Sequence, residues 1–248
     1  MCIRDRLCRL LNIFKENPDI ALVGGPNLTP LNSSLRERCS GYIFSSFLGS
    51  AWMSARYSSK KFLRNIDERV FMSCNMAVKR SAFFDVEGFP EDMFPGEEVI
   101  FVYKLRCKGY RLHYDPKLIV YHYRRPLFLP HIRQVFSYGW SKGLTVRKMG
   151  LRIGFLSLLP TFAVCYLILL PIIIFFIKSL LLLLFYMYSL LGGFILSLAE
   201  SLRLVIINKD FKALPFLTLG FIFHHISYGI GFLKGLIIQR GGSLCGRG

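Results

Sequence analysis

Short blocks of apolar and polar residues alternate over the first 150 residues of the chain. Apolar residues recur at helical spacing over Ile3–Phe14, which predicts an amphipathic helix that ends near Asn17-Pro18. The apolar run Ile20–Val23 predicts a strand, and Gly24-Gly25-Pro26 predicts a sharp turn after it. A serine-rich, basic stretch follows as far as residue 69, where we expect loops and short helices.

The same alternation continues into the middle of the chain. Phe71–Val78 is predicted to be a strand and Ser81–Val86 a short helix. We expect a loop over Glu91–Gly96 and then a helix over Glu97–Lys108, which Gly109 ends.

Two more short strands are predicted after that helix. Arg111–Tyr114 and Leu118–Tyr123 flank an Asp115-Pro116 turn. Strands and helices in this alternating order are typical of an α/β layer architecture. The first part of the chain is therefore predicted to be a folded α/β domain.

Long apolar runs replace this pattern beyond residue 150. Residues 151–177, 180–199 and 214–238 form three runs, each close to or above the roughly 20 residues that a membrane-crossing helix requires. Lys178 is the only charged residue between Ile153 and Ala199. The sequence predicts two domains: a charged one over residues 1–150, and a membrane region over residues 151–248 with about three hydrophobic helices.

Basic residues in the links predict the orientation of the membrane region. The link between the second and third runs carries Arg203, Lys209 and Lys212, whereas Lys178-Ser179 alone joins the first and second. By the positive-inside rule, the charged domain and the 200–213 link are cytoplasmic, and the protein is a multi-pass membrane protein. Three crossings would place the C-terminus outside. Because residues 200–213 are amphipathic, the alternative is that one or more runs are re-entrant or interfacial.

Composition and charge narrow the classes of function. The chain has 248 residues, 53% of them hydrophobic, which excludes a disordered tail or a collagen-like rod. The net charge is +17, yet no zinc finger, RNP-like run or basic heptad region is present, so we expect no nucleic-acid partner. The basic residues beside the first apolar run fit an anionic membrane surface instead. These residues are Lys142, Arg147, Lys148 and Arg152.

The residues with the most informative chemistry lie between positions 71 and 125. They include a polar turn, Ser73-Cys74-Asn75, an acidic pair, Glu97-Glu98, and a strand that ends in His122. The helix dipole stabilises carboxylates at a helix N-terminus, which gives the pair a structural explanation. Because adjacent carboxylates point in different directions, one can be anchored while the other faces a substrate as a general base. Arg124-Arg125 is more typical of a solvated pair than of a phosphate clamp.

Taken in order, these residues resemble glycosyltransferase family 2, the sugar transferases with a GT-A fold. Besides the acidic pair and the Ser73–Ala77 turn, the family's order matches a loop at Glu87–Glu91, a helix end at Lys104–Arg111 and a segment from Tyr114 to His122. The resemblance covers about residues 10–150. It implies an α/β fold class, with a partial GT-A (Rossmann-like) domain followed by a transmembrane α-helical segment.

The resemblance also implies a role for each matched residue. Glu98 would be the catalytic base that takes the proton of the acceptor hydroxyl, with Glu97 as a structural or acceptor-binding neighbour. The family usually has Asp at the second position, so the additional methylene of Glu98 moves the carboxylate by about a bond length. The Ser73–Asn75 turn would line the donor-sugar and acceptor pocket. His122 would help to hold a divalent metal, Mg²⁺ or Mn²⁺.

The implied function is a membrane-anchored transferase that moves a sugar, with inversion, from a nucleotide-diphospho-sugar donor to a lipid-linked or polysaccharide acceptor. The family's Asp-x-Asp motif is absent from the sequence. A complete nucleotide-binding half would also need roughly 90 or more residues before the Ile20 strand. We therefore expect an N-terminally truncated fragment that is inactive by itself. The alternatives are a catalytically silent membrane-anchored module that binds a sugar or a partner and, less favoured, a transporter component.

Two further groups lie beside or within the apolar runs. Arg133-Gln134 and Trp140 resemble in position, though not in spacing, the family's Gln-x-x-Arg-Trp region, which would place them in the acceptor pocket. Trp140 would stack on a sugar face or, as the alternative, serve as an interfacial aromatic. His224-His225 is an ionisable pair inside the third run and so a functional candidate, which neutral histidines facing a helix bundle would also explain.

Overall fold

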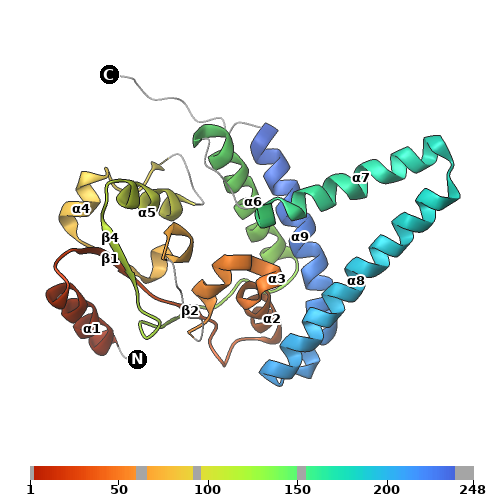
Figure 1. Cartoon of the computed structure of the whole chain (residues 1–248). Coiled ribbons are helices and arrows are strands. Elements are labelled where there is room, and N and C mark those ends of the chain that lie inside the picture. The colour runs from red at the N-terminus through yellow and green to blue at the C-terminus, as the bar shows by residue number, and fades with distance from the viewer. Residues whose placement is uncertain (1–2, 60–65, 92–95, 150–154, 238–248) are drawn as a thin grey trace. The chain divides into compact units, whose positions relative to one another are not determined.

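The computed structural model describes residues 3–59, 66–91, 96–149 and 155–237, which form many helices and a few short strands (Figure 1). The chain divides into two compact units, Met1–Arg124 and Arg125–Gly248. The first unit contains all the described strands, and the second unit is helical where it is described.

The N-terminal unit is built on two small sheets. Its helices are α1 (Ile3–Glu16), α2 (Leu35–Ser45), α3 (Phe47–Ser50), α4 (Arg80–Asp85) and α5 (Glu97–Cys107). Its strands are β1 (Ile20–Gly24), β2 (Asn27–Leu28), β3 (Met76–Val78), β4 (Arg111–Tyr114) and β5 (Val120–Tyr121). In the larger sheet β1 lies between an antiparallel β3 and a parallel β4, and β2 pairs in parallel with β5 in the smaller one.

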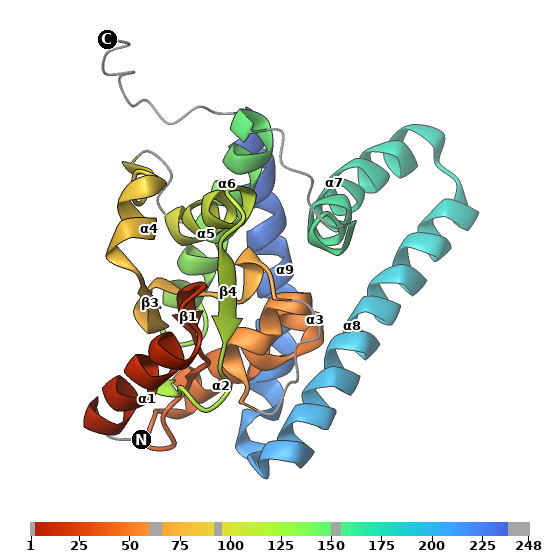
Figure 2. The ribbon, with the colours of Figure 1, turned by 60° about the vertical axis from the view of Figure 1, so that its left-hand side comes forward.

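Helices cover both faces of the larger sheet, because neighbouring strand residues point to opposite sides. Leu22 of β1 packs with Phe101 of α5 in a core on one face, whereas Val23 packs with Leu10 of α1 on the other. Figure 2 shows α1 on one side of β1 and β4, with α4 and α5 on the other. This arrangement agrees with the α/β layers that the alternating pattern predicts.

The described part of the N-terminal unit also contains the 3-10 turns η1 (Ala51–Tyr57), η2 (Glu68–Val70) and η3 (Ser73–Asn75). The predicted strand over Phe71–Val78 therefore forms only over Met76–Val78, and the prediction is wrong for residues 71–75. The reason is that the buried Asn75 side chain bonds across to two loops, which turns the backbone out of the extended conformation.

Most other predicted elements form close to their expected bounds, with two differences. The strand expected over Leu118–Tyr123 is reduced to β5. At Gly24-Gly25-Pro26, where a turn is expected, the backbone passes close to the backbone at Leu118. A Cβ atom at Gly25 would lie 2.3 Å from the carbonyl oxygen of Leu118, so only glycine fits there. Most of the loop expected over Glu91–Gly96 lies outside the described residues.

The C-terminal unit contains α6 (Leu129–Met149), α7 (Leu159–Ile177), α8 (Leu180–Asn208) and α9 (Leu214–Ile237), with 3-10 turns η5 (Phe155–Ser157) and η6 (Phe211–Ala213). Within the described ranges three helical segments are long and apolar enough to cross a membrane: Leu159–Ile177, Leu180–Asn208 and Phe211–Ile237. Each predicted apolar run thus forms a helix. Residues 151–154 and 238, at the ends of the predicted runs, lie outside the described part of the chain.

Two expected boundaries move. Helix α8 continues through the predicted link to Asn208, because no glycine or proline interrupts residues 194–208. Residues 129–149, which fall within the predicted charged domain, form a helix that was not predicted, α6, in the C-terminal unit, where it packs along α9. Glycines permit this packing: a Cβ atom at Gly139 would lie 2.2 Å from the carbonyl oxygen of Tyr228, and one at Gly231 would lie 2.2 Å from that of Phe136.

Candidate functional site

The acidic pair lies at the N-terminus of α5, and its two carboxylates have different partners. Gly96 precedes the helix with φ of 120°, a backbone conformation that favours glycine. The Glu97 carboxylate accepts a hydrogen bond of 2.9 Å from the Gly96 N–H. It therefore satisfies a free amide at the helix start, a structural role that also complements the helix dipole.

Glu98 faces an arginine from a distant part of the unit. Its Oε1 lies 3.8 Å from Nη1 of Arg56 in η1, and the two side chains are 17% and 4% exposed respectively. The Arg56 Nε donates to the carbonyl oxygen of Arg69, which fixes the guanidinium. Arg56 Nη2 is buried and has no hydrogen-bond partner among the described residues. Glu98 thus stays partly accessible beside a buried cation.

A second arginine lies close to the same turn. The Arg124 guanidinium lies 4.8 Å from the centre of the Tyr57 ring, and it donates to the backbone carbonyl of Asn27 and to Thr29 Oγ1. Only 7% of Arg124 is exposed, so the expectation of a solvated Arg124-Arg125 pair is wrong for Arg124. Burial raises the pKa of the Tyr57 hydroxyl by more than the nearby Arg56 and Arg124 lower it, so this phenol remains neutral at physiological pH.

The Ser73–Asn75 turn has one buried and two exposed residues. Ser73 and Cys74 are exposed, and the Cys74 sulfur accepts a hydrogen bond of 3.0 Å from the Asn27 amide. The Asn75 amide donates to the carbonyl oxygens of Pro26 at 2.9 Å and Leu118 at 2.7 Å, and its Oδ1 accepts from an α1 arginine. Asn75 is thus fully engaged in holding three segments together.

We use the name glutamate–arginine cluster for Arg56, Tyr57, Cys74, Glu98 and Arg124. These residues come from η1, η3, α5 and the end of the unit, and Tyr57 is the group that the other four influence electrostatically. Chemically, the cluster combines an accessible carboxylate with two held cations and a neutral phenol. Such a set can accept a proton from a hydroxyl and bind a polar or anionic substrate.

His122 makes no side-chain hydrogen bond or ion pair with this cluster in the described part of the chain. Its side chain is exposed, and its backbone N–H donates to the carbonyl oxygen of Leu28 at 2.9 Å. The described part of the chain contains no group of three or more His, Cys, Asp or Glu side chains that could hold a metal ion. The residues present therefore do not fit a complete metal site around His122.

The remaining predicted pocket residues belong to α6 in the C-terminal unit. Arg133 is exposed, and the Gln134 amide donates to the Tyr138 hydroxyl at 2.7 Å. The ammonium of Lys234 lies 4.3 Å from the centre of the Trp140 ring, so an α9 lysine occupies a face that a sugar would need.

The histidines of the third apolar run lie inside the helical unit. His224 is 5% exposed, and its Nδ1 lies 3.0 Å from Nε2 of His131 on α6. Of the two explanations for the His224-His225 pair, this contact favours the one in which the histidines face a helix bundle.

The sequence pattern did not identify Arg56 and Tyr57 as site residues, nor did it predict the burial of Arg124. Arg56 and Tyr57 lie in the mixed stretch before residue 69, where no periodicity marks them. An arginine and a tyrosine side by side in a serine-rich loop were the only signal, and that signal is weak. The contacts of Arg56 with Glu98 and of Tyr57 with Arg124 join residues at least 42 positions apart, so only the tertiary structure creates them.

Comparison with known proteins gives one relative of stated function. The chain is 30% identical over 228 residues to the dolichyl N-acetyl-alpha-D-glucosaminyl phosphate 3-beta-D-2,3-diacetamido-2,3-dideoxy-beta-D-glucuronosyltransferase of Methanococcus voltae. The match covers 91% of this chain and 63% of the relative, so the chain spans less than two thirds of that protein's length. No family model matches the chain, and no solved structure matches it.

Proposed function

We propose that this chain carries the acceptor side of a membrane-associated, family 2 glycosyltransferase that acts on a lipid-linked acceptor. The observation that carries the proposal is a similarity that extends over 91% of the chain to an enzyme named as a transferase to a dolichyl phosphate-linked sugar. The order of motifs from Ser73 to His122 supports the family, and the helices on both faces of the β3-β1-β4 sheet are compatible with part of a GT-A domain.

Glu98 is the general base in this proposal. Its carboxylate is partly accessible, and it makes no hydrogen bond with any described residue. It takes the proton from the acceptor hydroxyl while that oxygen attacks the anomeric carbon of the donor sugar. The bond from this carbon to the leaving phosphate oxygen breaks on the opposite face, which inverts the configuration.

Arg56 and Tyr57 have supporting roles in the same step. The buried guanidinium of Arg56 restricts where the Glu98 carboxylate can lie, and correct placement of a base contributes strongly to rate. The neutral Tyr57 hydroxyl is suited to donate to a sugar oxygen. If a divalent metal takes part in donor binding, as in the family, it requires ligands besides His122, so no step here depends on it.

The test compares the two members of the acidic pair. The protein is expressed in membranes, and sugar transfer to dolichyl N-acetylglucosaminyl phosphate, the kind of acceptor that the relative's name states, is measured. Glu98→Gln should lower kcat by roughly 10²- to 10⁴-fold, because it removes the base and preserves the shape. Glu97→Gln, its matched control, should change kcat much less. Unchanged turnover of Glu98→Gln removes Glu98 from the base role.

A second candidate is a membrane-anchored module that binds a sugar without transferring it. It is favoured by Glu98, which stands where the family usually has aspartate. In that case Glu98→Gln and the unchanged protein would bind the acceptor equally, and neither would transfer sugar. Measuring acceptor binding alongside turnover separates the two candidates.

A further inference from the structure

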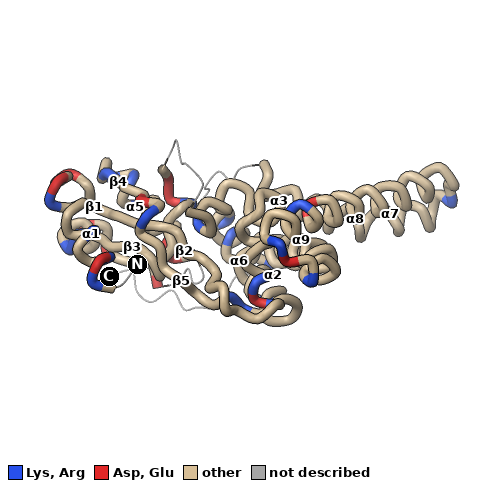
Figure 3. The backbone as a smooth tube through the Cα atoms, turned by 90° about the horizontal axis from the view of Figure 1, so that it is seen from below, with Lys and Arg blue, Asp and Glu red and all other residues tan. Residues whose placement is uncertain are grey.

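The apolar helices differ in how far the protein covers them. In the most apolar part of each helix, 50% of the α9 residues are buried, against 11% in α7 and 6% in α8. Figure 3 shows α7 and most of α8 as an arm with no charged residue except the lysine at its tip. The buried residues of α8 lie only in its second half. They are Ser197, Ser201, Leu204 and Val205.

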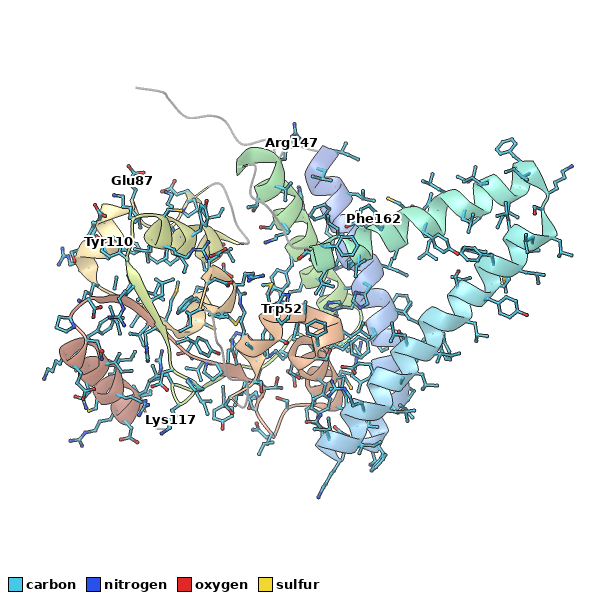
Figure 4. All side chains as sticks on the ribbon, viewed as in Figure 1. Trp52, Glu87, Tyr110, Lys117, Arg147 and Phe162 are labelled. Carbon is cyan, nitrogen blue, oxygen red and sulfur yellow. The ribbon has the colours of Figure 1, made fainter. Side chains whose placement is uncertain are left out.

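Helix α6 provides much of the cover of α9, and it runs parallel to it. His131 of α6 contacts His224 of α9 at 3.0 Å, and the Ser227 hydroxyl donates to the carbonyl oxygen of Ile132 at 2.7 Å. Further along both helices, Arg147 Nη1 donates to the carbonyl oxygen of Ile237 at 3.1 Å, at the end of α6 labelled in Figure 4. The two helices therefore run in the same direction, side by side. Residues that contact each other across the pair would lie at the same depth in a membrane.

This register places a charge beside the middle of α9. Arg133 follows Ile132 directly, so it lies level with Ser227, and its side chain is exposed. If α9 crossed a bilayer over Phe211–Ile237, Arg133 would lie near the bilayer centre. A charged side chain at that depth is among the most unfavourable placements in a membrane protein.

The start of α7 is also incompatible with an upright α9. A Cβ atom at Gly229 would lie 2.5 Å from the carbonyl oxygen of Pro160, so α7 begins beside a point past the middle of α9. From there α7 runs away from α9 rather than along it (Figures 1 and 2). Membrane-crossing helices tilt by about 40° at most, so α7, which leaves α9 at a wide angle, is not expected to cross beside an upright α9.

We propose that only the α7–α8 hairpin crosses the membrane, and that the α6–α9 pair lies along the membrane surface. Leu219, Phe223, Ile230 and Ile237 of α9 are spaced four, seven and seven residues apart, which places them on one helix face. Each is at least 43% exposed, which gives the pair an apolar stripe for the lipid interface. This inference is independent of the proposed function, and it replaces the three crossings that hydropathy predicts with two.

Two crossings place both ends of the chain on one side of the membrane, and three place them on opposite sides. The full chain, with one epitope tag before Met1 and another after Gly248, is expressed in a bacterial inner membrane, and sealed inverted vesicles are treated with protease. We expect both tags to be digested together, and the protein to resist extraction by alkaline carbonate. Digestion of only one tag, or release by carbonate, overturns the proposal.

A matched pair of substitutions tests which helix is in the lipid. Leu191 of α8 and Ile230 of α9 are similarly exposed, at 52% and 45%. Leu191→Arg places a charge near the middle of the hairpin and should lower the membrane-integrated fraction at least roughly tenfold, whereas Ile230→Arg should lower it less than about twofold. Equal loss in the two variants, or no loss in either, contradicts the proposal.

Discussion

The contact between α6 and α9 gives a sharp test of how the C-terminal unit is held together. A Cβ atom at Gly231 would lie 2.2 Å from the carbonyl oxygen of Phe136, which is 1.2 Å closer than the 3.4 Å at which ordinary contact begins. Both partners are backbone groups of helices, so no side-chain rotation can relieve the clash. Gly231→Ala therefore forces the two helices apart.

The magnitude follows from two opposing terms. Forcing an extra methyl group into a tightly packed contact costs about 1–3 kcal/mol, and the rigid backbone puts this case at the upper end. Alanine is a better helix former than glycine by about 1 kcal/mol, which offsets part of that cost. We expect a net loss near 2 kcal/mol in the free energy of unfolding, roughly 30-fold in the ratio of folded to unfolded protein.

Unfolding by SDS in mixed micelles measures this loss. Trp140 lies in the contact, since a Cβ atom at Gly235 would be 2.2 Å from its carbonyl oxygen, and its fluorescence reports the separation of the helices. The chain has two tryptophans, so the assay uses a Trp52→Phe background. The control is Gly192→Ala in α8, where nothing lies within 4 Å, and this variant should be neutral or up to about 1 kcal/mol more stable.

Combining Gly231→Ala with Gly139→Ala should cost less than the sum of the two, because one separation of the helices accommodates both methyl groups. If Gly231→Ala is as stable as the unchanged protein, or if Gly192→Ala loses as much stability, the close α6–α9 contact is not what stabilises this unit.

Three further predictions concern single side chains. Asn75→Ala removes three hydrogen bonds and should lower the free energy of unfolding by about 2–3 kcal/mol in a urea titration, whereas Ser73→Ala at an exposed position should lower it by less than about 0.5 kcal/mol. Burial lowers the pKa of His131, which faces His224, to about 4. Between pH 6.5 and pH 4 the unfolded chain therefore binds a proton that the folded chain does not. The free energy of unfolding should be at its full value above pH 6.5 and should fall as the pH drops from 6.5 towards 4. SDS titrations over that pH range should show the fall, and His131→Gln should flatten it. Arg56→Lys keeps the charge and loses the planar guanidinium, so kcat should fall about tenfold with little change in KM, and equal activity over the whole pH profile would show that Arg56 does not position Glu98.

The sequence by itself determined the local elements. The helical spacing of Ile3–Phe14, the strand Ile20–Val23 and the helix stop at Gly109 each depend on residues close together in the chain, and the structure has them. The long apolar runs were equally clear, because about 20 apolar residues in a row leave few alternatives to a buried or membrane helix. Two adjacent carboxylates at a helix start also predicted a division of roles, and Glu97 and Glu98 have different partners.

Only the tertiary structure decided what those elements contact. The hydrogen bonds of the buried Asn75, the burial of Arg56 and Arg124, and the pairing of α6 with α9 depend on residues far apart in sequence. His131 and His224, for example, are separated by 93 positions. Periodicity records that a face is apolar, but it does not record which partner covers that face. An apolar helix can be covered either by protein or by lipid, so hydropathy gives the same prediction for α9 and for α7. The two helices are distinguished by packing, because α9 lies against α6 through close glycine contacts.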